Sequence, residues 1–418
     1  MTQWTPSVRS RSTAADRPRR PWPVLLAVLG PGLLAGLSDD DPAGITTYSV
    51  LGADHGYRLL WVLLASTVAL IVFHSLGARL GVVTGQGLVG LVRHRYGVRV
   101  SLVVLATLVL ANVGTAAAEY AGVAAGAELL GLDRSLAVLV AGVGVTALVL
   151  LGNFHRVEHL LLVLSAVFLA YVGAGLLAHP DWHAATTGLV VPRMGFNHAE
   201  TVIVAATVGT TLAPWGLSFI QSYAVDKKLT RRDLRYERVD VVVGATLTGI
   251  IGFFVVIASA ETLHTRGIHI QTAADAARAL TPVAGHLAGD LFGIGLIGAA
   301  LLAAAVVPLS TAYSICDLTG AEAALDSRFA DAKLFYLSDI VVTVLAAALV
   351  LLPGVPLIGL LVLTQTVNAV LLVPMLVVMV RMSRDRHLLG ELTVRRPIYA
   401  AQLVVLVGVV VSVVLLVI

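Results

Sequence analysis

A run of three acids, Asp39, Asp40 and Asp41, interrupts an apolar stretch that extends from about residue 22 to residue 51. Each acid would cost roughly 2.5–3.5 kcal/mol if it faced lipid. Pro42 follows directly, and it lacks the backbone N–H group that would continue a helical hydrogen-bond pattern. Non-helical backbone at membrane depth is tolerated only where it is buried in protein or lines water. We therefore expect a broken helix whose carboxylates and freed carbonyls face a polar cavity.

Carboxylate and carbonyl oxygens are the ligands that hard divalent cations such as Mg²⁺ and Mn²⁺ prefer. Asp41 is the first candidate for direct or water-mediated contact with such an ion, because an acid inside a membrane is functional by default. Three acids on one broken helix do not all face one ion. For Asp39 and Asp40, an ion-binding role and a solvated position at the entry therefore remain equally open.

The composition restricts the class of protein. The chain has 418 residues, of which 58% are hydrophobic and 13% charged, with a mean hydropathy of +0.91. These values argue against a soluble domain and indicate a polytopic, all-α membrane protein. The single cysteine, Cys316, excludes an internal disulfide. The basic residues cluster at the ends of apolar segments, so we expect no nucleic-acid partner. We expect no cofactor; the lipid bilayer and a transported divalent cation are the expected partners.

Apolar segments long enough to cross a membrane recur along the chain, each needing about 20 residues. We expect eleven transmembrane helices, at about residues 23–51, 57–79, 99–129, 134–153, 157–178, 198–224, 238–261, 286–316, 336–353, 355–381 and 397–418. A short amphipathic segment, residues 85–96, follows the second. Residues 1–20 are polar and predict a disordered tail instead of a cleaved signal peptide. Residues 21–418 then form a single transmembrane domain.

Lysine and arginine mark one side of these spans. They gather before residue 23, at 93–99, at 156, at 227–238, at 328–333 and at 381–396. All of these segments fall on the same side of an eleven-span chain, which makes that side the cytoplasm. We expect a multi-pass protein of the cell membrane with its N-terminus in the cytoplasm.

A second break is expected at Ala213-Pro214-Trp215, in the sixth span and five spans after the first. Paired interruptions in two halves of a chain predict an inverted repeat with a binding site near the midplane. The repeats would cover about residues 23–178 and 198–381, followed by an extra span at about 397–418. The alternative is that Pro214 only kinks a helix.

Asp41-Pro42-Ala43-Gly44 and Ala213-Pro214-Trp215 resemble the two broken-helix motifs of the NRAMP family of metal-ion transporters. Gly56-Tyr57, the turn at residues 80–85 and Ala118-Glu119-Tyr120 are also similar to that family. The resemblance covers most of the chain and is strongest over residues 30–96. It implies a LeuT-like fold, with a 5+5 inverted repeat in which helices 1 and 6 are broken.

Several departures from the NRAMP pattern affect which ion the site would prefer. The family's Asp-Pro-Gly-Asn motif here ends in Gly44, and its Met-Pro-His motif here has Ala213 and Trp215. A thioether is a soft ligand that favours transition metals over Mg²⁺, so its absence removes that discrimination. Smaller side chains also widen the site, which suits an ion that keeps several waters, as Mg²⁺ does. These replacements resemble the NRAMP-related magnesium transporters, which carry Mg²⁺ as well as Mn²⁺.

The resemblance also implies further site residues. Thr210 and Ala213 would offer backbone carbonyls beside the second break, and Gly44 would offer space or a carbonyl. Gln365 would reach the site from the tenth span, although an interhelical hydrogen bond is equally open for it and for Asn368.

Proton coupling is not expected. Relative to the family pattern, an acid three residues before Glu119 is replaced by Ala116, and the histidine is replaced by Trp215. The family's arginine of the ninth span is replaced near Ser338-Asp339. Glu119 itself is either a remaining relay group or a buried, hydrogen-bonded acid. We therefore expect import that is driven by the cation gradient alone.

Other functions are less well supported. A proton-coupled Mn²⁺/Fe²⁺ transporter of ordinary NRAMP type is the first alternative. An amino-acid transporter of the same fold would present helix N-termini to a carboxylate, not three acids. A metalloenzyme is disfavoured, because His155, Glu158 and His159 do not follow the His-Glu-x-x-His pattern. A channel remains open, since the sequence does not report gating.

Overall fold

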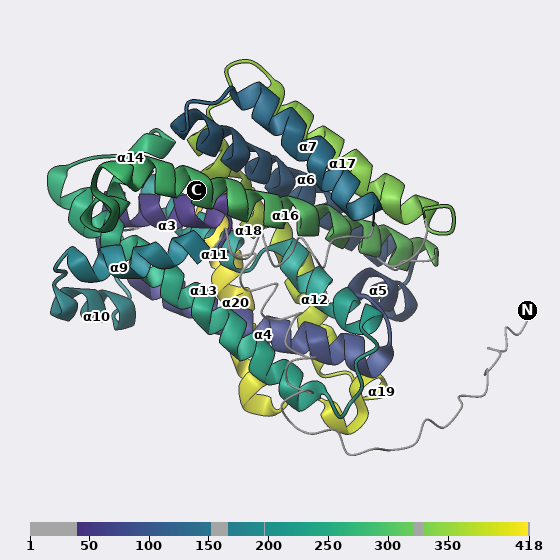
Figure 1. Cartoon of the computed structure of the whole chain (residues 1–418). Coiled ribbons are helices and arrows are strands. Elements are labelled where there is room, and N and C mark those ends of the chain that lie inside the picture. The colour runs from purple at the N-terminus through teal and green to yellow at the C-terminus, as the bar shows by residue number, and fades with distance from the viewer. Residues whose placement is uncertain (1–39, 152–165, 196, 322–328, 417–418) are drawn as a thin grey trace, which may run out of the picture.

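The computed structural model describes residues 40–151, 166–195, 197–321 and 329–416, and all regular elements in these segments are helical (Figure 1). Eight helical runs among them are long and apolar enough to cross a membrane. They are α4 (Leu60–Thr84), α6 (Val98–Leu129), the pair α11 (His198–Thr211) and α12 (Pro214–Asp226), α13 (Leu234–Thr262), α16 (Ala288–Thr319), α17 (Lys333–Leu351), α18 (Leu357–Ser383) and α20 (Arg396–Leu415). The all-α, polytopic membrane architecture is thereby confirmed.

The remaining expected spans are described in part or are shorter. The fourth corresponds to α7 (Arg134–Leu150), and the end of the fifth to α9 (Ala170–Leu177). The second half of the first span forms α3 (Pro42–His55). The first half of that span, the tail of residues 1–20, Asp39 and the His155–His159 pair lie outside the described residues.

Several short helices connect the spans. The amphipathic segment forms α5 (Leu88–Tyr96), as expected. The polar loop before α16 contains α14 (Ala273–Ala277) and α15 (Thr281–Ala284), and α19 (Arg386–Leu389) precedes α20. Hydropathy did not indicate α10 (Trp182–Val190). The carboxylate of Asp181 caps α10 by accepting the N–H groups of His183 at 2.9 Å and Ala184 at 3.0 Å.

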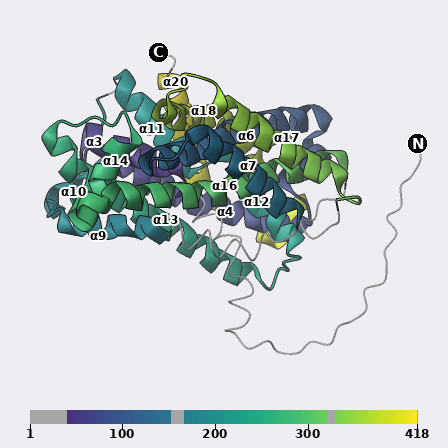
Figure 2. The same cartoon turned by 45° about the horizontal axis from the view of Figure 1, so that its top comes forward.

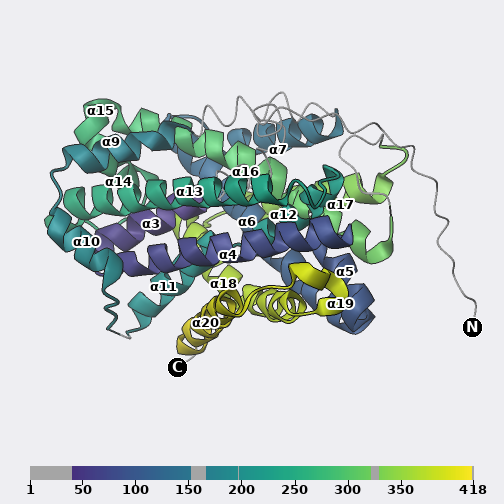
Figure 3. The ribbon, with the colours of Figure 1, turned by 90° about the horizontal axis from the view of Figure 1, so that it is seen from below.

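The helices form two groups joined by crossing elements. Helices α6, α7 and α17 pack together on one side, and α4, α9 and α13 lie on the other (Figures 1 and 2). Helix α16 packs along α6, while α11 packs along α18 and also contacts α3 and α4. Helix α20 lies at the edge of the molecule, against α18, α11 and α4 (Figure 3).

The expected break in the sixth span is confirmed. Helix α11 ends at Thr211 and α12 starts at Pro214, and the two residues between them leave helical geometry. Leu212 has φ −106° and ψ 44°, and Ala213 has φ −56° and ψ 134°. Proline at the first position of α12 is favoured because its missing N–H group would have no helical partner there. Ala43 near the start of α3 and Ala213 belong to the same buried cluster, and α11 packs against α3, so the break in the sixth span lies in the interior.

Candidate metal centre

Asp41 caps the N-terminus of α3. Its side chain is buried, with 4% of the residue exposed, and its Oδ1 accepts the N–H of Gly44 at 2.5 Å. The carbonyl of Asp41 accepts the N–H of Ile45 at 2.9 Å. Aspartate before a proline is a favourable helix start, which explains this geometry from the sequence. The Oδ1 atom of Asp41 is thus engaged in the cap of α3.

Two further acids lie beside Asp41 without conventional partners. Asp40 is 2% exposed, and neither of its carboxylate oxygens has a hydrogen-bond partner among the described residues. Glu119 of α6 is fully buried and faces Asp41, but at a geometry that completes no hydrogen bond. A buried, unpaired carboxylate is strongly unfavourable. Two such groups beside the buried Asp41 therefore form a location where a cation would lower the energy.

These acids do not enclose an ion by themselves. Within the described part of the chain, no three Asp, Glu, His or Cys side chains converge as a ready metal cage. An ion bound here would take its other ligands from neutral oxygens and water.

The end of α11 supplies such oxygens. Pro214 has no N–H group, so the carbonyl of Thr210, four residues earlier, loses the donor that a continuous helix would give it. The Thr210 hydroxyl is also buried without a partner in the described structure. Helix C-termini carry partial negative charge, which favours a cation. A hydrogen bond of 3.0 Å between the hydroxyls of Tyr48 and Thr211 ties this end of α11 to α3.

The carbonyl of Ala213, which was expected to be offered beside the second break, takes part in backbone hydrogen bonds. It accepts the N–H groups of Gly216 at 3.1 Å and Leu217 at 3.4 Å, and so begins the hydrogen-bonding of α12. The free carbonyl belongs to Thr210 instead. Gly44 donates its N–H group to the Asp41 side chain. The expectation that its missing side chain provides space at the site stays a prediction.

Gln365 of α18 lies next to the α11 break. Its backbone carbonyl touches Gly209 so closely that a Cβ there would come within 1.9 Å of it. The Gln365 Oε1 accepts a hydrogen bond from Asn368 Nδ2 at 2.9 Å, while its Nε2 has no partner among the described residues. Asn368 Nδ2 also donates to Thr115 of α6 at 2.9 Å. The interhelical bond is therefore made by Asn368, and it holds Gln365 in place.

The sequence reasoning missed a polar row on α6. Asn112, Thr115 and Glu119 lie three and four residues apart, on one face of a helix that is otherwise apolar. Asn112 Nδ2 donates to Thr311 of α16 at 2.8 Å, and Thr115 meets Asn368 of α18. The helical spacing of these three residues was a visible signal, although it does not identify their partners.

Trp215 occupies the place where the NRAMP pattern has a histidine. It is fully buried, and its ring packs against Phe219 at a centroid distance of 6.2 Å. Its carbonyl accepts a hydrogen bond from Ser310 at 2.9 Å. An indole does not titrate, so this side chain fills space where an imidazole would exchange a proton.

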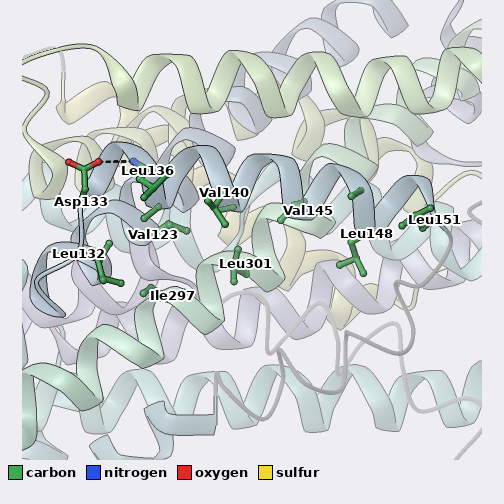
Figure 4. Close-up of a pocket in the computed structure, with 15 residues that line it drawn as sticks. Val123, Leu132, Asp133, Leu136, Val140, Val145, Leu148, Leu151, Ile297 and Leu301 are labelled. Carbon is green, nitrogen blue, oxygen red and sulfur yellow. Dashed lines mark hydrogen bonds between the residues drawn. The ribbon is translucent and has the colours of Figure 1, made fainter.

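A cavity of about 760 Å³ lies elsewhere (Figure 4). Apolar side chains of α6, α7 and α16 line it, including Val140, Leu148 and Leu301. The carboxylate of Asp133 at its end accepts the N–H of Leu136 at 2.8 Å and caps α7. This cavity has no ion-binding chemistry.

Known proteins share this architecture. A "Divalent metal cation transporter MntH" of Burkholderia ambifaria is 31% identical over 284 residues, which are 66% of this chain and 64% of that relative. The structure of a manganese transporter of Eremococcus coleocola superposes with a TM-score of 0.76 at 18% identity, covering 98% of this chain and 89% of the other.

A nucleobase-cation-symport-1 family transporter also superposes, with a TM-score of 0.60 at 16% identity, covering 93% of this chain and 91% of that one. These superpositions confirm the LeuT-like fold.

The family profile described as "Natural resistance-associated macrophage protein-like" matches residues 32–418. Proteins of this family are transporters and not enzymes. With this profile covering nearly all of the chain, and with the sixth span broken at Pro214, the protein belongs to the NRAMP family.

Proposed function

We propose that this protein imports divalent metal cations, Mg²⁺ and also Mn²⁺, by alternating access and without coupling to protons. The observation that carries the proposal is the group of three buried carboxyls, Asp40, Asp41 and Glu119, together with the free Thr210 carbonyl at the end of α11, a helix that packs against α3. Such a site attracts a cation and not an anion. The names of the relatives, a divalent metal cation transporter and a manganese transporter, support the same class of substrate.

The ligand chemistry supports magnesium. The candidate ligands are oxygens from Asp40, Asp41, Thr210 and Gln365, while Ala213 and Trp215 bring no thioether or imidazole to the junction. Oxygen ligands suit Mg²⁺ and Mn²⁺ alike, and only a soft ligand would discriminate between them. Gly44 and Ala213 add little side-chain volume, which leaves room for the waters that Mg²⁺ retains.

The absence of proton coupling rests on the neutral residues around the acids. Ala116 and Trp215 are buried and cannot carry a proton. Beyond Asp40 and Asp41, Glu119 is the titratable group of this junction.

A proton-coupled Mn²⁺/Fe²⁺ transporter is the second candidate. The proximity of Glu119 to Asp41 favours it, since two neighbouring buried carboxyls are groups that could exchange a proton. The names of the relatives agree with it as well.

In the proposed orientation, a single transmembrane domain spans the cell membrane. The N-terminus lies in the cytoplasm. The basic segments between α5 and α6, between α12 and α13 and after α18 support this side as the cytoplasmic one. The opposite side carries α10 and few basic residues. Transport from that side inward would be import.

The test is cation uptake into proteoliposomes, with Mg²⁺ and Mn²⁺ compared in parallel and a pH-sensitive dye inside. We expect saturable uptake of both ions, no change of internal pH beyond that of empty liposomes, and loss of uptake in Asp41→Ala. Uptake of Mn²⁺ with neither transport of nor competition by Mg²⁺ would replace the magnesium proposal with the second candidate. Acidification that accompanies metal entry would refute uncoupled transport.

A further inference from the structure

A groove at the edge of the molecule combines an apolar slot with a basic mouth. A cavity of about 240 Å³ lies between α4, α11 and α20, and a second of about 700 Å³ continues it toward the side of α10. The two share four lining residues, Trp61, Val204, Gly408 and Ser412, so they form one groove. Figure 3 shows α20, which forms one wall of this groove, at the periphery of the molecule.

The slot is elongated. Its wall includes Trp61, Ala65 and Ala69 of α4, Val204 and Val208 of α11 with Leu212 just beyond its end, and Val404, Gly408 and Ser412 of α20. The sets on α4 and α20 each extend over eight residue-to-residue steps, which is about 12 Å of helix at 1.5 Å per step. Gly408 leaves the slot open, because a Cβ built on it has no other atom within 4 Å. An extended hydrocarbon chain fits such a slot, whereas a compact ligand would leave most of it empty.

The mouth is basic. Arg58 and Arg193 both line the outer cavity, beside Trp61. Arg58 is held by Glu200, with 3.0 Å between Nη2 and Oε1, and its charge is thereby balanced. The guanidinium of Arg193 has no hydrogen bond or ion pair within the described residues, while its carbonyl accepts the indole N–H of Trp61 at 3.3 Å. Arg193 is therefore an uncompensated cation at the mouth of an apolar slot.

We propose that this groove binds one anionic phospholipid of the non-cytoplasmic leaflet, with its phosphate at Arg193 and one acyl chain between α4, α11 and α20. Guanidinium groups recognise phosphate through paired hydrogen bonds, and tryptophan favours the membrane interface. The net negative headgroup is required because a zwitterionic lipid would bring its own positive charge to Arg193 and Arg58. The bound chain contacts Leu212, which directly precedes Ala213 at the break, so the lipid lies against the element that forms the candidate metal centre.

Native mass spectrometry of the full-length protein with phosphatidylglycerol or phosphatidylethanolamine tests the proposal. We expect one phosphatidylglycerol to be retained at least about fivefold more than phosphatidylethanolamine, with that preference lost in Arg193→Gln. Arg134→Gln is the matched control, because Arg134 also lies on the non-cytoplasmic side but pairs with the exposed Glu128 at 3.5 Å. Equal retention of the two lipids, or unchanged phosphatidylglycerol retention in Arg193→Gln, would overturn the proposal.

A second pair of variants tests the acyl slot. Gly408→Leu adds a side chain that projects into the slot, where a Cβ on this residue meets no other atom within 4 Å. We expect this variant to lose retention of the lipid. Val407→Leu places the same leucine side chain on the adjacent residue, which does not line the groove, and this variant should bind the lipid normally. Full retention in Gly408→Leu would refute the placement of the chain. None of these readouts requires transport, so they stand or fall separately from the proposed function.

Discussion

Gly122 of α6 lies against Pro42 of α3 so closely that a Cβ on the glycine would come within 2.4 Å of the proline Cγ. The same Cβ would lie 3.5 Å from Ala300 of α16. Glu119 precedes Gly122 by one helical turn on the same face of α6, and Asp41 precedes Pro42 directly. The close approach of these two helices is therefore what brings Glu119 to Asp41.

Gly122→Ala should weaken this contact. Because the added methyl group meets a rigid proline ring, α6 and α3 must separate, and overpacking of this kind costs about 1–3 kcal/mol. We expect a lower melting temperature and reduced metal uptake in proteoliposomes. Gly144→Ala is the control, since a Cβ at Gly144 of α7 meets no other atom within 4 Å. If Gly122→Ala transports and melts like the unmodified protein, the proposed tight contact is wrong.

Asp41→Asn should separate the cap of α3 from ion binding. Asparagine is as good a helix cap as aspartate, so the fold should be retained. The lost charge should lower the uptake rate at least about tenfold, equivalent to about 1.4 kcal/mol. Asp133→Asn is the matched control, because Asp133 caps α7 by accepting the N–H of Leu136 but is not part of the group formed by Asp40, Asp41 and Glu119. Normal uptake in Asp41→Asn would show that this residue is only a cap.

Asp40→Asn should change stability in opposite directions with and without metal. The carboxylate is buried without a partner among the described residues, so removing its charge should stabilise the metal-free protein by about 1–3 kcal/mol. A metal ion at a concentration of about 100 times its Kd raises the free energy of unfolding by about 2.7 kcal/mol. The variant should lose much of this metal-induced stabilisation. Thermal unfolding in detergent with and without Mg²⁺ or Mn²⁺ measures both effects. An unchanged metal-induced shift would exclude Asp40 from the site.

Ala213→Met should shift selectivity toward Mn²⁺. The thioether adds a soft ligand at the break, and soft ligands favour transition metals over Mg²⁺. Ala213 is only 2% exposed, so the larger side chain also takes space there. Ala213→Leu controls for volume, because leucine is similar in size but has no sulfur. Uptake of Mn²⁺ in the presence of excess Mg²⁺ should resist competition in the methionine variant alone; equal behaviour of the two variants would contradict the ligand argument.

The sequence by itself determined the membrane helices and the break in the sixth span. Spans follow from hydropathy because a helix of fixed rise must cover a fixed thickness of hydrocarbon. The break at Pro214 follows because proline has no N–H group, and the same argument frees the Thr210 carbonyl. The polar segment that forms α10 escaped this reasoning, since a short helix capped by Asp181 at the membrane surface has no long apolar run.

Only the tertiary structure decided how the pieces meet. Asn368 bonds to Thr115, and Glu119 faces Asp41, yet these residues are 253 and 78 positions apart in the chain. Their pairing depends on which helix faces lie together, and the small side chain of Gly122 controls the approach at the acids. Hydropathy assigns a residue to the membrane but not to a neighbour, because lipid and protein interior are equally apolar.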